Sequence, residues 1–243
     1  MRTIKWLSYP DAFLETEPYE SYTHSAHFFK KLAENNIHTL TYLAAPGDSA
    51  WQLSARTFAG LRTLEIIHPT HPHGLRLALR HCDALHSLTI VAKYDVEIMS
   101  HLPADASILP SLCALKILPP EVTLPWKITK RSVDALDAFL AERPGLRMLD
   151  VPPIFVDSRY GPNGGMLRTL RNAKVKVLAF DFSCIRHLAE TWLQLMDGCI
   201  PLDVTALLLG FGVTDTEYSL AMETAILELV CPFVSSYIRV HRD

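Results

Sequence analysis

A short apolar phrase recurs along almost the whole chain, and this recurrence limits the possible folds more than any other feature. In each copy an apolar residue is followed by two residues, a second apolar residue, one residue and a third apolar residue. The clear copies are Ile37/Leu40/Tyr42, Leu61/Leu64/Ile66, Leu85/Leu88/Ile90, Leu112/Leu115/Ile117, Leu146/Leu149/Val151, Val175/Leu178/Phe180 and Val204/Leu207/Leu209. They are spaced by 24, 24, 27, 34, 29 and 29 residues, close to the period of roughly 20–29 residues of one class of strand-and-helix repeat. A first copy at Ile4/Leu7/Tyr9 and a last strand near residues 236–240 extend the series.

Helix-forming segments lie between these copies. The best is 214–230, where Thr214 and Glu217 have capping-box spacing and the apolar residues fall on one face. A second lies at 188–196, and weaker helices are expected at 25–35, 74–81 and 132–142. Because strands alternate with helices at this short period, neighbouring strands should be parallel and the stacked units should share one core. The pattern predicts an α/β solenoid, a single irregular domain of about eight units over residues 1–243. The rival is an ordinary doubly wound α/β sheet, but the glycine-rich strand-to-helix turns of that fold are missing.

The residues that open several repeats are also characteristic. Two segments resemble the irregular repeats of fungal F-box/leucine-rich-repeat-like proteins: His81-Cys82-Asp83-Ala84-Leu85-His86-Ser87-Leu88-Thr89-Ile90 and Arg143-Pro144-Gly145-Leu146-Arg147-Met148-Leu149-Asp150-Val151. The resemblance implies a leucine-rich-repeat horseshoe, with parallel strands on the concave face and helices or loops on the convex face. In that family the repeats recruit a substrate, and an N-terminal F-box docks on the adaptor of a cullin ubiquitin ligase.

The chain departs from that family in two respects. The asparagine that usually follows the third apolar position is absent, so we expect an irregular stack. No F-box is recognisable and the first repeat begins almost at Met1, so we expect a piece or a remnant of a longer F-box/leucine-rich-repeat gene. A role in a ubiquitin ligase therefore follows from the resemblance and not from any individual residue.

The composition narrows the classes of partner. Hydrophobic residues make up 49% of the chain and charged residues 20%, with a formal net charge of −3. Binding to nucleic acid is not expected, because phosphate contacts require a basic excess. The longest mostly apolar stretch, Val204–Val213, is too short to span a bilayer, so no membrane partner is expected. The five cysteines contain no C-x-x-C pair, which favours reduced thiols and a cytoplasmic or nuclear protein.

Two surfaces are candidates for binding a protein partner. Side chains that flank the second apolar residue of each copy should point onto the concave face, which is hydroxylic in its N-terminal half, as at Thr39, Thr41, Thr63, Ser87 and Thr89. The C-terminal half is largely apolar and carries Met148, Asp150, Val177, Ala179, Ala206 and Leu208. The long connections 118–131 and 152–165 should lie side by side, and they carry Trp126, Lys127, Phe155, Arg159 and Tyr160. Aromatic residues and arginine are common interface anchors. The alternatives are that the C-terminus covers the apolar half, and that Trp126 and Phe155 belong to the core.

Motifs for catalysis or cofactor binding are weak. His68, His71 and His73 form a cluster, but the prolines between them favour an extended, solvated loop over a zinc site. The glycine-rich segment 161–165 lacks the endings of a P-loop or dinucleotide site, and no G-x-S-x-G elbow occurs. We therefore predict a non-enzymatic protein–protein interaction scaffold with no catalytic residue, metal or cofactor. The alternative is an α/β enzyme whose catalytic groups are not identifiable in the sequence.

Overall fold

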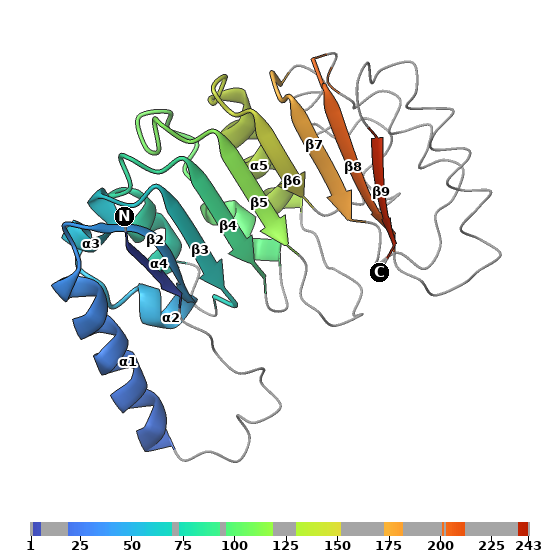
Figure 1. The fold of residues 1–243 in the computed structure, drawn as a ribbon. Coiled ribbons are helices and arrows are strands. Elements are labelled where there is room, and N and C mark those ends of the chain that lie inside the picture. The colour runs from blue at the N-terminus through green and yellow to red at the C-terminus, as the bar shows by residue number, and fades with distance from the viewer. Residues whose placement is uncertain are drawn as a thin grey trace.

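The computed structural model describes residues 2–5, 19–69, 73–92, 96–118, 130–151, 173–181, 201, 203–211 and 238–242. These residues include nine parallel strands in one sheet, and the order of the strands in the sheet is their order in the chain (Figure 1). The strands are β1 (Arg2–Lys5), β2 (Leu40–Pro46), β3 (Thr63–Ile67), β4 (Ser87–Val91), β5 (Ala114–Leu118), β6 (Met148–Val151), β7 (Val177–Asp181), β8 (Ala206–Phe211) and β9 (Ile238–Arg242). In a doubly wound sheet the strand order reverses at a switch point. The sequential order therefore excludes the doubly wound alternative and is compatible with an α/β solenoid.

The helices of the described residues form a layer beside this sheet. They are α1 (Tyr19–Asn35), α2 (Gly47–Ala50), α3 (Ala55–Ala59), α4 (His73–Leu79), the 3-10 helix η2 (Val96–His101) and α5 (Lys130–Ala141). The helices α3, α4 and α5 lie behind the strands in Figure 1, and α1 lies at the end of the sheet that holds β1 and β2. We call the side of the sheet turned away from α3, α4 and α5 the open face.

The predicted helices are confirmed where the structure describes them, with shifted ends. The helix expected at 25–35 begins earlier, at Tyr19, and those expected at 74–81 and 132–142 are α4 and α5. The short helices α2, α3 and η2 were not expected from the sequence. The segments 188–196 and 214–230 lie outside the described residues.

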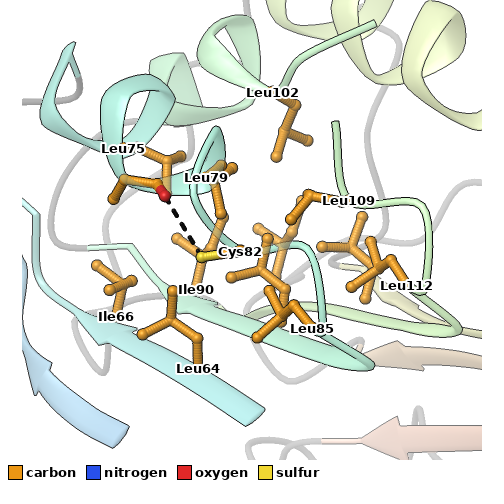
Figure 2. Close-up of a cluster of buried hydrophobic side chains, with 14 of the residues drawn as sticks. Leu64, Ile66, Leu75, Leu79, Cys82, Leu85, Ile90, Leu102, Leu109 and Leu112 are labelled. Atoms are coloured by element: carbon orange, nitrogen blue, oxygen red, sulfur yellow. Dashed lines mark hydrogen bonds between the residues drawn. The ribbon is translucent and has the colours of Figure 1, made fainter. Parts of the chain in front are cut away.

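A continuous apolar core lies between the sheet and the helices. Along β3, β4 and β5 the residues alternate between buried and half-buried. Leu64, Ile66 and Ile90 of the sheet face Leu75 and Leu79 of α4 in this core, which Figure 2 shows. Burying each such side chain contributes about 1.5–3 kcal/mol. One unit alone could not bury both its strand and its helix, so the units are stable as a stack.

Backbone hydrogen bonds keep the units in register. Five times, the carbonyl of the residue just before a strand accepts two N–H groups from the next unit, at 2.8–3.0 Å. The accepting residues are Arg62, His86, Cys113, Arg147 and Lys176, and the donors are His86/Ser87, Cys113/Ala114, Arg147/Met148, Lys176/Val177 and Thr205/Ala206. Because main-chain groups make these bonds, the bonds themselves do not require a particular side chain at any of these positions.

A turn precedes each of five strands and adds a buried position to the repeat. In each turn the N–H of the first apolar residue donates to the carbonyl three residues earlier, at 3.1–3.2 Å. The accepting residues are Phe58, Cys82, Leu109, Arg143 and Pro201, and all of them are buried. Four are apolar or a thiol, whereas Arg143 is charged and only 6% exposed.

The prediction for the first two repeats was wrong by three residues. In the observed register Leu43 pairs with Leu64 and Ala45 with Ile66, so the buried triad of β2 is Leu40/Leu43/Ala45 rather than Ile37/Leu40/Tyr42. The backbone of Ile37 belongs instead to the turn that follows α1, since its N–H donates to Glu34. In β1, Ile4 pairs with Leu43, which makes Ile4 the second and not the first apolar residue of its copy. The last strand is confirmed, two residues later than expected.

Candidate binding surface

Two rows of side chains cross the strands on the open face. The first row is Tyr42, Thr63, Ser87, Ala114, Met148, Val177 and Ala206, each paired with the next. The second row is Ala44, Glu65, Thr89, Lys116, Asp150, Ala179 and Leu208. Neighbours in a row are one strand spacing apart, about 4.7–4.9 Å. The rows alternate with the buried core positions, which places them on the face opposite the core.

The register of β2 differs from the expected one, so β2 contributes other residues to this surface than the sequence predicted. Thr39 and Thr41 were expected on it, but Tyr42 and Ala44 take these positions in the rows, and Ala44 is fully buried. The Tyr42 hydroxyl donates to Glu65 Oε2 at 2.8 Å, linking the first row on β2 to the second row on β3. Burial, this hydrogen bond and the negative charge of Glu65 raise the pKa of Tyr42 to about 12. Tyr42 therefore presents a fixed, protonated phenol beside a carboxylate.

A second polar contact lies at the middle of the surface. Lys116 Nζ on β5 is 3.9 Å from Asp150 Oδ2 on β6, and the two side chains are 37% and 18% exposed. An ion pair this long and this exposed contributes little to stability, about 0–1 kcal/mol. Its importance is chemical, because it places both a cation and an anion where the polar half of the surface meets the apolar half.

The structure brings together the six residues predicted for the C-terminal half. Met148, Val177 and Ala206 are consecutive in the first row, and Asp150, Ala179 and Leu208 are consecutive in the second row. Met148, Val177, Ala206 and Leu208 are half-buried, which leaves part of each apolar side chain open to solvent. Ala179 is only 6% exposed and offers little side-chain surface.

The second predicted surface is not described by the structure. Trp126, Lys127, Phe155, Arg159 and Tyr160 all lie outside the described residues. The proposed alternatives for Trp126 and Phe155 therefore stay predictions. Sequence reasoning missed Tyr42 on this surface, and therefore the pair that Tyr42 forms with Glu65, because Tyr42 had been assigned to the core. The signal that could have found them was the second match to the apolar spacing, which begins at Leu40.

The thiol of Cys82 has the surroundings of a structural cysteine and not those of a reactive one. The Cys82 thiol is fully buried and lies 3.4 Å from the carbonyl oxygen of Ala78 (Figure 2). Burial, and to a smaller extent the charge of Asp83, raise the pKa of Cys82 to about 12, so the thiol stays protonated and poorly nucleophilic. Cys82 is part of the buried core. Among the described residues no three His, Cys, Asp or Glu side chains are grouped to hold a metal ion.

Comparison with known proteins does not assign this chain to a family. In the part of the chain that the structure describes, no helix is both long and apolar enough to cross a membrane. No protein-family model and no curated protein matches the chain.

Proposed function

We propose that this chain is a leucine-rich-repeat scaffold without enzymatic activity that binds a protein partner through the open face. The observation that carries the proposal is the regular pair of side-chain rows across β2 to β8, which alternate with the core positions and so face away from the helix layer. A surface of this kind offers many weak contacts over a long track, which suits another protein better than a small molecule.

The chemistry of the rows indicates what the partner presents. From β2 to β6 the rows offer hydroxyl groups, the Tyr42–Glu65 pair and the Lys116–Asp150 pair. From β6 to β8 they offer the apolar groups of Met148, Val177, Ala206 and Leu208. The complementary partner has polar and charged groups along one part of its contact and an apolar patch along the other.

The resemblance to F-box/leucine-rich-repeat-like proteins suggests a biological context for this binding. We propose that the bound protein is a substrate delivered to a ubiquitin ligase. The support for this context is the sequence of two repeats, His81–Ile90 and Arg143–Val151. Binding through the open face does not depend on it.

A matched pair of substitutions tests the binding proposal. Met148→Glu puts a charge at the centre of the open face, where Met148 is half-buried. Leu77→Glu makes the same change on α4, where Leu77 is 61% exposed on the helix side. The two variants and the wild type are used as baits in quantitative affinity purification from the native host. The proposal expects a partner that Leu77→Glu retains and Met148→Glu loses.

The outcomes separate the two parts of the proposal. If Met148→Glu and Leu77→Glu capture the same proteins as the wild type, the open face is not the binding surface. If a partner is lost with Met148→Glu but its cellular half-life is the same with wild type and variant, the scaffold stands and the ubiquitin-ligase context is wrong. Circular dichroism of both purified variants checks that each is folded.

A further inference from the structure

Two histidines from neighbouring units meet on the helix side of the sheet. His73 is the first residue of α4, which follows β3, and His101 is the last residue of η2, which follows β4. The centroids of their imidazole rings are 4.9 Å apart, and the ring planes are inclined by 82°. The two residues are far apart in the sequence, so only the stacking of the units brings the rings together. Sequence reasoning had grouped His73 with His68 and His71 instead.

Close packing fixes the backbone on both sides of this pair. Gly74 lies against the indole of Trp51 so closely that a Cβ there would overlap the ring. Leu75 follows and is fully buried. Beside His101, Met99 and Leu102 are buried as well. The backbones that carry the two imidazoles are therefore held by packing, which limits the conformational entropy that would be lost if both rings bound the same ligand.

The separation of the rings suits a shared metal ion. A histidine nitrogen lies about 2.0–2.1 Å from zinc, which places the ring centroid about 3.2 Å from the ion. Two such rings at a tetrahedral angle have centroids about 5.2 Å apart, close to the 4.9 Å between His73 and His101. His73 is exposed and His101 half-buried, so an ion can approach the pair from solvent.

We propose that His73 and His101 form a binding site for a divalent first-row transition-metal ion, with zinc as the reference case. Imidazole ligands suit zinc, copper and nickel and are poor ligands for magnesium and calcium. With two protein ligands, water completes the coordination, so the ion exchanges more readily than in a closed four-ligand structural site. The bound ion links α4 to η2 and so joins the unit after β3 to the unit after β4. This site is independent of the open face.

Zinc titration of the purified chain tests the proposal. Isothermal titration in a non-chelating buffer is expected to show binding to the wild type, with a rise in Tm because the ion binds the folded state, which holds the two imidazoles together, more tightly than the unfolded chain. His73→Ala and His101→Asn should each weaken binding at least about tenfold. The double variant should bind no more weakly than either single variant, because the first substitution already breaks the chelate. His81→Ala, which changes an exposed histidine just after α4, is the matched control and should bind like the wild type.

The proposal is overturned if His73→Ala and His101→Asn keep the wild-type affinity for zinc. It is also overturned if His81→Ala weakens binding as much as they do, since that result means diffuse binding to surface histidines. His73 is exposed, so His73→Ala is expected to fold even if His101→Asn does not. The Tm of each variant without metal checks the fold.

Discussion

Arg143 is buried at the turn position before β6, which uncharged residues occupy in the neighbouring units. Its Nη2 donates to the carbonyls of Pro103, Asp105 and Ile108 at 2.8–3.0 Å, and its guanidinium lies 4.1 Å from the centre of the Phe139 ring. Burial lowers the pKa of Arg143, and the charges of Asp105 and Glu142 partly offset this. Through these contacts the Arg143 side chain connects the longest unit to the segment that precedes β5.

Arg143→Met should therefore destabilise the chain. The substitution keeps an apolar stem of similar length but leaves the three carbonyls without their donor. We expect a loss of about 2–4 kcal/mol in the free energy of unfolding, measured by urea denaturation. Arg143→Lys, which keeps the charge but not the planar group, should lose less. A Met variant as stable as the wild type would show that the cost of burying the guanidinium already cancels its hydrogen bonds.

Tyr42 gives a pH dependence in the alkaline range. Its pKa is raised to about 12 in the folded chain, from its ordinary value of 10.0. Between these values the unfolded chain loses the proton first, so the stabilisation that Tyr42 provides is complete below about pH 10 and falls as the pH approaches 12. Ultraviolet titration of the wild type minus that of Tyr42→Phe should show one tyrosinate forming near pH 12. A difference curve centred near pH 10 would mean that Tyr42 is neither buried nor hydrogen-bonded to Glu65 in solution.

At the scale of the element, β2 shows where a repeat pattern becomes ambiguous. The apolar spacing is satisfied twice, by Ile37/Leu40/Tyr42 and by Leu40/Leu43/Ala45. The larger side chains favoured the first triad, and the structure uses the second, because the turn after α1 includes Ile37. A small residue such as Ala45 gives no strong apolar signal, yet it is fully buried against the next unit.

The register of β2 can be checked by a pair of alanine substitutions. Leu43 is fully buried, so Leu43→Ala should cost about 2–5 kcal/mol in the free energy of unfolding. Thr39 is exposed just before the strand, and Thr39→Ala should change stability by less than about 0.5 kcal/mol. Both are measured by urea denaturation. In the register expected from the sequence Leu43 would point outward, so a near-neutral Leu43→Ala would support that register.

The sequence predicted more of the strands than of the segments between them. From Leu61 onward the expected triads coincide with the pairing from β3 to β8, because a Leu, Ile or Val marks nearly every buried position. The short helices α2 and α3 were missed, since four or five residues give too little periodicity to recognise. The six expected open-face residues from Met148 to Leu208 follow from the same strand register. The Tyr42–Glu65 hydrogen bond and the His73–His101 pair are contacts between units, and no pattern within a single repeat encodes such contacts.

On the scale of the whole molecule, the two sides of the sheet differ in regularity. In the observed register the triads begin at Leu40, Leu61, Leu85, Leu112, Leu146, Val175 and Val204, so the intervals run from 21 to 34 residues. The paired carbonyl acceptor before each strand is nevertheless the same at five successive junctions. The variation in length is therefore taken up outside the strands, and the open face keeps an even spacing. Evenly spaced strands of this kind form the extended surface that repeat proteins use for binding.

Site-specific photocross-linking tests most directly whether the open face is the binding surface. A photoreactive amino acid is placed at Val177 or Ala114 on the open face, or at Leu77 or Arg76 on the helix side. Each chain is irradiated in the native host, and the cross-linked proteins are identified by mass spectrometry. The account predicts one shared partner from Val177 and Ala114 that is not cross-linked from Leu77 or Arg76. Cross-linking of that partner only from the helix-side positions would contradict it.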